Sequence, residues 1–193
     1  GTWFWNRYPG ARCDIESMEY SYSFSEQLQQ EWKWTDKYSS GPEILEYAKH
    51  VVERFDLSRF IAFDSRVATA TYDENETTWD IELETGQRYH ARYCVMATGT
   101  LSSVNAPDFP GLESYRGARY LTGRWPEAGV DLTGKHVGII GTGSTAIQAI
   151  PMIAKEAGHL TVFQRTANYS IPARNRPLDA GEVATVKAGY PSI

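Results

Sequence analysis

The sequence predicts an α/β fold in which an antiparallel β meander precedes a parallel βαβ unit. In residues 60–96, apolar and polar side chains tend to alternate, which is the period of a half-buried strand. Later, the apolar run 137–140 meets a glycine-rich turn, and apolar residues then recur at helical spacing from Ile147 onward. A second apolar run at residues 160–163 completes a strand, helix and strand of about 30 residues.

The composition is that of a globular protein, since 41% of the 193 residues are hydrophobic and 13% are aromatic. The formal net charge is −5 and there is no basic cluster, which argues against nucleic-acid and membrane partners. No apolar stretch approaches ~18 residues and no signal-peptide pattern opens the chain, so we expect a cytoplasmic protein. Cys13 and Cys94 are expected to be reduced thiols, and the scattered histidines lack metal-ligand spacing, so no metal is expected.

The sequence pattern of residues 1–55 predicts two helices. Residues 1–40 are rich in aromatic residues and turn formers, which indicates irregular backbone with one short helix at residues 25–34, begun by Ser25 as its N-cap. Gly41 and Pro42 then open a longer helix. Its apolar residues fall on one stripe that we expect to be core: Ile44, Leu45, Ala48, Val51, Val52 and Phe55.

Four strands form the predicted meander, at residues 61–63, 67–72, 79–83 and 89–95, with turns at 73–76 and 84–87. The last strand ends in the small residues Ala97, Thr98, Gly99 and Thr100. Such an end is either a simple turn or a place where a bound molecule approaches the backbone, and the pattern leaves both open.

Prolines and a glycine mark a linker near residues 101–112, between the meander and the βαβ unit. The helix of the βαβ unit is expected to end in a C-cap at Gly158. A further short helix is predicted from about Leu178.

The glycine-rich turn of the βαβ unit has the spacing of a dinucleotide-binding fingerprint, Gly141-x-Gly143-x-x-Ala146. Gly141 permits the turn, Gly143 lets a pyrophosphate approach the backbone, and the small Ala146 lets helix and strand pack closely. The helix N-terminus then offers unpaired N–H groups and a partial positive charge to the phosphates. The alternative is a glycine-rich turn that binds nothing, which the surrounding βαβ pattern disfavours.

The second strand of the unit is followed by Gln164, Arg165 and Thr166, about 20 residues past the glycines. An NAD site would have an acidic residue there to bind the ribose 2′-hydroxyl. A guanidinium and a hydroxyl instead suit a 2′-phosphate, since arginine can bind it through two hydrogen bonds. These residues therefore favour NADP, the alternative being an ordinary surface arginine beside a strand end.

Five stretches carry a family resemblance, at residues 3–14, 97–99, 141–146, 163–166 and 172–175. Together they resemble the class B flavoprotein monooxygenases, specifically the Baeyer–Villiger monooxygenases, over essentially the whole chain. The resemblance implies a partial two-dinucleotide-binding-domain (Rossmann-like) flavoprotein with an antiparallel β meander. It also implies a reaction in which NADPH reduces FAD, O2 adds to form a C4a-peroxyflavin, and one oxygen atom enters a ketone to give an ester or lactone. It implies no particular oligomeric state.

The resemblance also assigns roles to individual residues. Asp14 is implied as catalytic, because a carboxylate there can hold an active-site arginine that lies outside these residues. The alternative for Asp14 is an Asx turn after Arg12 and Cys13. The implied FAD contacts are Trp3, Tyr20 and the backbone at Val67. Arg12 and Asp14 are implied to lie near the junction of the flavin and the nicotinamide, and Thr98 and Gly99 are implied cofactor contacts. The implied NADP contacts are Gly141, Thr142, Gly143, Ser144, Thr145, Ala146, Gln148, Arg165 and Thr166.

A linker signature of the same family, Phe-x-Gly-x-x-x-His-x-x-x-Trp-Pro, is matched at residues 115–126. Gly117, Trp125 and Pro126 fit the signature, and Tyr115 is a mild change. Leu121 stands where the family has a histidine associated with coupling movement of the NADP domain to catalysis. Leucine can neither hydrogen-bond nor titrate through its side chain. The alternative is a purely structural linker with a buried leucine at this position.

The resemblance implies a segment of a longer protein. It divides the chain into the remainder of an FAD-binding domain at 1–101, a linker at 102–112, the first βαβ unit of an NADP-binding domain at 113–171, and the start of a helical insertion at 172–193. The first FAD fingerprint would lie outside these residues, so the segment alone is expected to be inactive and prone to aggregate. Two other functions stay open: an N- or S-oxygenating flavin monooxygenase, which Trp125 and Pro126 disfavour, and a non-catalytic nucleotide-binding relative.

Overall fold

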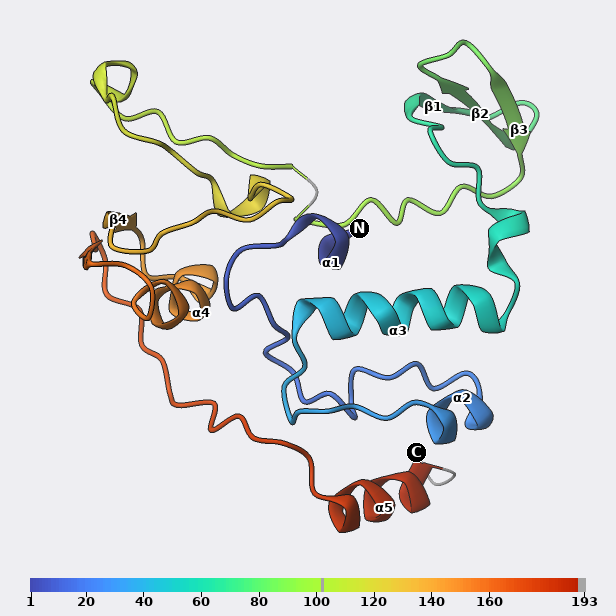
Figure 1. Ribbon diagram of the computed structural model, residues 1–193. Coiled ribbons are helices and arrows are strands. Elements are labelled where there is room, and N and C mark those ends of the chain that lie inside the picture. Colours follow the sequence, from blue (N-terminus) through green and yellow to red (C-terminus); the bar gives the residue numbers. More distant parts are fainter. Residues whose placement is uncertain (102, 191–193) are drawn as a thin grey trace. The chain divides into compact units, whose positions relative to one another are not determined.

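The computed structural model describes residues 1–101 and 103–190 (Figure 1). Ser102, in the predicted linker, and residues 191–193, in the predicted helical insertion, lie outside the described residues. The chain forms two compact units. The first consists of Gly1–His50 and Leu101–Ile193, and the second consists of Val51–Thr100.

The second unit contains a three-stranded antiparallel sheet in the order β1-β2-β3. The strands are β1 (Val67–Asp73), β2 (Thr78–Leu83) and β3 (Arg88–Ala91). Asp73 fixes the first hairpin turn, because its carboxylate accepts hydrogen bonds from the N–H groups of Asn75 and Glu76 at 2.8 and 3.1 Å. Gly86 turns the second hairpin with φ +82°. The predicted meander and both of its turns are confirmed.

Two of the predicted strands are wrong in whole or in part. Residues 61–63 form no strand; they follow the 3₁₀ turn η1 (Leu57–Phe60), and Phe63 is 73% exposed. The last strand ends at Ala91 instead of continuing to residue 95, and Val95 is 88% exposed. A strand needs a neighbouring backbone to share its hydrogen bonds, and none of the described segments pairs with residues 92–99.

The first unit opens with three helices, α1 (Thr2–Trp5), α2 (Glu26–Glu31) and α3 (Gly41–Arg54). The sequence pattern does not predict α1, because a single turn is too short to show a period. The predicted short helix is confirmed as α2. Ser25 is its N-cap, and the Ser25 hydroxyl accepts a hydrogen bond from the Leu28 N–H at 3.3 Å.

The buried side of α3 packs with aromatic residues that precede it in the chain. Ile44, Tyr47 and Val51 are buried, and the other members of the predicted stripe are half-buried. Tyr47, which the stripe omits, packs its ring against Trp32 and Trp34 at centroid distances of 5.1 and 4.9 Å. The core prediction is therefore confirmed for Ile44 and Val51, but the buried side of the helix also includes Tyr47.

The predicted βαβ unit is confirmed in the second half of the first unit. The strands β4 (His136–Ile140) and β5 (His159–Phe163) pair in parallel, and α4 (Ser144–Ile153) connects them. Leu132, Ala149 and Ile153 are buried and form a small core. Val137 and Leu160 pack against this core, so α4 covers one face of the two strands.

Gly158 has a different role from the predicted C-cap. Helix α4 ends with Ala154 in a right-handed helical conformation as its C-cap residue, and Gly158 does not have a positive φ. A Cβ atom at Gly158 would lie 2.6 Å from the backbone oxygen of Gly134. Glycine is therefore needed for the close approach of two backbone segments. The C-cap prediction is wrong because both uses of glycine look alike in a sequence.

Gly158→Ala is expected to lower the free energy of unfolding by about 1–3 kcal/mol, because the added methyl group meets backbone that cannot rotate away. Thermal unfolding followed by circular dichroism measures this effect. Gly189→Ala is the matched control, since a Cβ atom there meets nothing within 4 Å. Equal transition midpoints for the two variants would contradict the close approach.

Helix α5 (Ala180–Gly189) lies beside α2 (Figure 1). Its N-cap is Asp179. Near its other end, the Lys187 ammonium donates to the carbonyl oxygens of Gln30 and Trp32 at 2.6 and 2.7 Å. The predicted short helix is confirmed. Within residues 1–101 and 103–190, no helix has both the length and the apolar character needed to cross a membrane.

Candidate functional site

The fingerprint turn between β4 and α4 has the geometry that its glycines predict. Gly141 has φ +106°, a conformation that L-residues rarely adopt, and its N–H donates to the Phe163 carbonyl oxygen at 2.8 Å. Gly143 is exposed, and a Cβ atom there would meet nothing within 4 Å. The backbone is therefore open to a ligand at the residue where a pyrophosphate is expected to approach.

The N-terminus of α4 has no side-chain cap. Its N-cap residue is Gly143, so no capping side chain satisfies the N–H groups of Ser144, Thr145 and Ala146 in the first turn. Free N–H groups at the positive end of the helix dipole bind anions. This end of α4 therefore fits a pyrophosphate.

Thr142 joins the turn to the segment that follows β5. Its hydroxyl oxygen accepts hydrogen bonds from the side-chain amides of Gln164 at 2.9 Å and Asn168 at 3.2 Å. Arg165 and Thr166 lie between these two residues in the chain, and both are exposed. The segment with the predicted 2′-phosphate contacts is thus held against the fingerprint turn. Sequence reasoning missed Asn168, which belongs to no motif.

Two predicted FAD contacts, Trp3 and Tyr20, touch each other. The indole N–H of Trp3 donates to the Tyr20 hydroxyl at 2.9 Å, and the two rings meet edge to face with centroids 6.1 Å apart. Both side chains are half-buried. The contact fixes α1 against the segment that follows Asp14.

Asp14 follows a short extended stretch that pairs with the residues before α3. The N–H of Cys13 donates to the Ser39 carbonyl oxygen at 3.0 Å, and the N–H of Gly41 donates to the Ala11 carbonyl oxygen at 2.8 Å. Asp14 itself is exposed, and no Asx turn is seen, since its carboxylate bonds to none of the residues that the structure describes. The carboxylate is therefore available to a partner.

Arg12 and Gln148, two of the implied cofactor contacts, are hydrogen-bonded to each other. The Gln148 side-chain amide accepts a hydrogen bond from the Arg12 N–H at 3.2 Å and donates to the Arg12 carbonyl oxygen at 3.1 Å. The Tyr8 hydroxyl also donates to Gln148 Oε1 at 2.8 Å. Burial raises the pKa of the Tyr8 phenol, so at neutral pH it keeps the proton that it donates. Sequence reasoning missed Tyr8, because Tyr8 and Gln148 are 140 positions apart in the chain.

Val67, Thr98 and Gly99 lie in the second unit. Val67 begins β1 and is 51% exposed. Gly99 has φ +75° at the end of an extended, mostly exposed stretch. This conformation fits both a simple turn and a backbone approach by a ligand, so the role of these residues as FAD contacts stays a prediction.

The linker signature is anchored through its Trp-Pro end. Trp125 packs against the buried Leu132, Ala149 and Ile153 cluster of the βαβ unit, and its ring centroid lies 5.6 Å from that of Tyr120. Pro126 begins a turn, in which its carbonyl oxygen accepts a hydrogen bond from the Gly129 N–H at 3.0 Å. The signature tryptophan therefore ties the linker to the nucleotide-binding fold.

The remaining signature residues differ in exposure. Tyr115 and Gly117 are exposed and follow the 3₁₀ turn η2 (Leu112–Ser114). Leu121 is half-buried and immediately precedes the 3₁₀ turn η3 (Thr122–Arg124). Its side chain is apolar, so at the position of the family histidine this chain offers packing but no hydrogen bond or charge.

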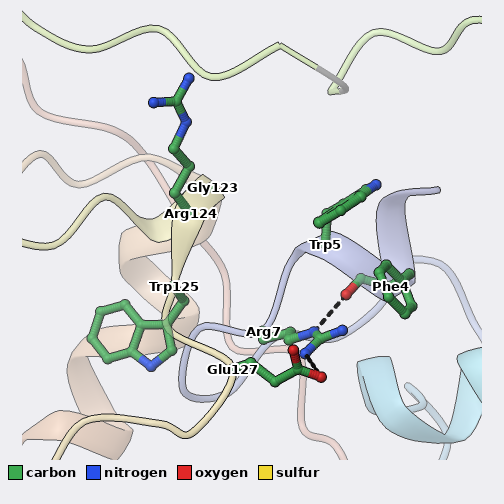
Figure 2. A pocket seen from close by; sticks show the side chains of 7 residues that line it. All are labelled: Phe4, Trp5, Arg7, Gly123, Arg124, Trp125 and Glu127. Atoms are coloured by element: carbon green, nitrogen blue, oxygen red, sulfur yellow. Dashed lines mark hydrogen bonds and ion pairs between the residues drawn. The ribbon is translucent and has the colours of Figure 1, made fainter. Parts of the chain in front are cut away.

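A cavity of about 410 Å³ lies between α1 and the signature (Figure 2). It is lined by Phe4, Trp5, Arg7, Gly123, Arg124, Trp125 and Glu127. Arg7 forms an ion pair with Glu127 at 2.7 Å and donates to the Phe4 carbonyl oxygen at 2.6 Å, as the dashed lines in Figure 2 show. Arg7 thereby joins the first helix to the segment that follows Trp125. No motif in the sequence marks Arg7 or Glu127 as partners.

In the described part of the chain, no three His, Cys, Asp or Glu side chains gather in a way that could hold a metal ion. Cys13 and Cys94 are both free thiols. Burial raises the pKa of the Cys13 thiol, which keeps it in the less reactive protonated form.

Comparison with known proteins gives matches along the whole chain. The family model for pyridine nucleotide-disulphide oxidoreductase matches residues 12–177. A Baeyer–Villiger monooxygenase of Pseudooceanicola batsensis is 47% identical over 193 residues, which is 100% of this chain and 35% of that protein. The phenazine N-monooxygenase PhzNO1 of Lysobacter antibioticus is 42% identical, over 100% of this chain and 36% of that protein. A solved structure, an oxidized steroid monooxygenase bound to NADP, is 55% identical with a TM-score of 0.93, over 100% of this chain and 37% of that one.

These matches bear on both the fold and the resemblance. The chain spans about a third of the length of these relatives. The predicted α/β fold and the resemblance to Baeyer–Villiger monooxygenases are confirmed over the whole chain. Because the family model covers most of its residues, the chain belongs to the pyridine nucleotide-disulphide oxidoreductase family.

Proposed function

We propose that the protein is a Baeyer–Villiger monooxygenase, which uses FAD and NADPH to insert one oxygen atom of O2 into a ketone and release an ester or lactone. The observation that carries this proposal is the open N-terminus of α4 with Arg165 in the adjoining segment, within a chain that matches such an enzyme along its whole length. FAD, when bound, would supply the redox and oxygen chemistry. The protein would orient it and control the charge around it.

NADP would be held between the fingerprint turn and the end of β5. Gly141 and Gly143 would let the pyrophosphate approach, and the first N–H groups of α4 would bind it. Arg165 and Thr166 would bind the 2′-phosphate, with Thr142 holding their segment in place. The similar steroid monooxygenase structure is bound to NADP, which supports this choice of cofactor.

FAD would be held by residues within 1–101. The proposed contacts are Trp3, Arg12, Asp14, Tyr20, the backbone at Val67, Thr98 and Gly99. The exposed Asp14 carboxylate would hold an arginine contributed by another part of the protein. We also propose that the chain divides by function into FAD-binding residues at 1–101, a linker at 102–112, NADP-binding residues at 113–171 and the start of a helical insertion at 172–193. A cytoplasmic location is also proposed, and the two free thiols support it.

Leu121→His in the full-length protein is expected to raise the ratio of ester to hydrogen peroxide formed from NADPH by roughly fivefold. A histidine at this position could make one hydrogen bond of about 1 kcal/mol that leucine cannot make. Ester is measured by gas chromatography and peroxide by a coupled peroxidase assay. Leu121→Gln is the control for polarity alone, and an unchanged ratio in Leu121→His would contradict a coupling role.

N-oxygenation is the second candidate function. It is favoured by the similarity to a phenazine N-monooxygenase, which is nearly as strong as that to the Baeyer–Villiger enzyme. Trp125 and Pro126 favour the ketone instead, because they match the Trp-Pro end of the Baeyer–Villiger signature. Both functions use the same two cofactors, so the substrate alone separates them.

The test uses the purified full-length protein. We expect bound FAD, and NADPH oxidation that accelerates when linear or cyclic ketones are added. A phenazine and a tertiary amine complete the substrate panel. N-oxide formation without any ester would select the second candidate, and a protein that binds neither flavin nor NADPH would reject both.

A further inference from the structure

Gln148 lies one turn into α4, yet its side chain bonds to the N-terminal segment of the chain. Its three hydrogen bonds run to Tyr8 and Arg12. Gln148, Tyr8 and Arg12 together form what we call the Gln148 bridge. The bridge joins two segments that the proposed function assigns to different cofactors, residues 12–14 to FAD and α4 to NADP.

The bridge uses nearly all the bonding capacity of one amide group. Gln148 Oε1 accepts from the Tyr8 hydroxyl at 2.8 Å and from the Arg12 N–H at 3.2 Å, which occupies both of its lone pairs. Gln148 Nε2 donates to the Arg12 carbonyl oxygen at 3.1 Å. A carboxylate could not donate the third bond, and an apolar side chain could make none. The acceptor side of Gln148 is thus already filled within the chain.

Close packing at Gly10 supports the bridge. Gly10 has φ +80°, and a Cβ atom there would overlap the backbone oxygen of Gln148. The turn before Arg12 therefore lies directly against the backbone of α4. Packing and hydrogen bonds together hold the loop and the helix at a single spacing.

We propose that Gln148 is a positioning residue that sets the distance between the NADP pyrophosphate site and the loop that carries Arg12 and Asp14. This inference rests on the proposed function. In that function the two bound cofactors would supply a hydride transfer, in which NADPH is oxidised to NADP⁺ as FAD is reduced by two electrons. The reacting atoms must lie about 3–3.5 Å apart, and a shift of about 1 Å between the two binding segments can cost roughly 100-fold in rate. The bridge controls this alignment without touching a reacting atom.

Gln148→Met in the full-length holoenzyme tests the proposal, because it removes all three hydrogen bonds and keeps an unbranched side chain of similar size. Reduction of FAD by NADPH without O2 is followed by stopped-flow absorbance, and NADP⁺ affinity is measured separately by titration. The limiting reduction rate is expected to fall about 10-fold, while the Kd for NADP⁺ changes by less than about 3-fold. Tyr8→Phe removes only one of the bonds, so a smaller loss of about 3-fold is expected.

Gln87→Met is the matched control, since Gln87 is exposed and its side chain has no hydrogen bond to the described residues. It should change neither quantity. Hydrogen exchange at the Arg12 amide gives a readout that does not depend on activity, and exchange is expected to be faster in Gln148→Met.

Three results would overturn the positioning role. A parallel loss of NADP⁺ affinity and reduction rate would make Gln148 a cofactor contact. An unchanged reduction rate would show that Gln148 does not affect the alignment. Unchanged hydrogen exchange at the Arg12 amide would show that the bridge does not form. If the unaltered protein is not reduced by NADPH at all, the proposed function fails, and the positioning role that rests on it fails with it.

Discussion

Asp14→Asn is expected to slow ester formation by about 100-fold, the scale of losing one preorganised electrostatic contact in an active site. The amide keeps the shape of the side chain but loses the charge that would hold an arginine beside the negative charge that develops during oxygen transfer. Reduction of FAD by NADPH should stay within about 3-fold of the unaltered rate, because Asp14 would not act in that step. Gas chromatography measures the ester, and stopped-flow absorbance measures the reduction.

Glu19→Gln is the matched control for Asp14→Asn. Glu19 is exposed, lies in the same segment, and loses the same charge in this change. It should leave both rates unchanged. If Asp14→Asn slowed reduction and ester formation equally, the carboxylate would act on the fold or on FAD binding, which would contradict its role in oxygen transfer.

Arg165→Ala is expected to raise the Kd for NADPH by about 10- to 150-fold and to change the Kd for NADH little. The loss corresponds to a charge-assisted interaction of about 1.5–3 kcal/mol with the 2′-phosphate, which NADH lacks. The exposed position of Arg165, in a segment held to the fingerprint turn through Thr142, suits this contact. Titration with each nucleotide measures the two values.

Arg92→Ala removes the same charge from an exposed arginine of the second unit and serves as the control. It should leave the preference for NADPH over NADH unchanged. Equal weakening of NADPH and NADH by Arg165→Ala would contradict the 2′-phosphate contact, and the choice of NADP would then need another residue.

The βαβ unit could be predicted from the sequence because its signals are local. The strand of residues 137–140, the glycines of the turn and the helix that follows are continuous in the chain, and each pattern agrees with its neighbours. The Ser25 cap and the hairpin turn at Asp73 were predictable for the same reason, because a capping or turn side chain bonds within a few residues of itself.

The predictions that failed all concern residues whose structure depends on a distant segment of the chain, which a local sequence pattern does not show. Residues 61–63 and 92–95 are apolar enough for strands, but a strand also needs a neighbour to pair with. Gly158 was expected to end a helix, whereas it serves the approach of the Gly134 backbone.

The parts of the site that sequence reasoning missed also depend on partners far away in the chain. The bonds of Gln148 to Tyr8 and Arg12 join residues 140 and 136 positions apart. Asn168 is bonded to Thr142 across 26 positions without belonging to a motif. A motif identifies the residues that meet a ligand, but it does not identify those that hold two motifs together.

Isotope labelling shows whether the protein inserts oxygen as an NADPH-dependent flavoprotein. The purified full-length protein is supplied with NADPH, a cyclic ketone and ¹⁸O2, and the product is examined by mass spectrometry. We expect a lactone that carries one ¹⁸O atom, formed in step with NADPH consumption. NADPH consumption that yields hydrogen peroxide and no labelled lactone or ester from any ketone would contradict it.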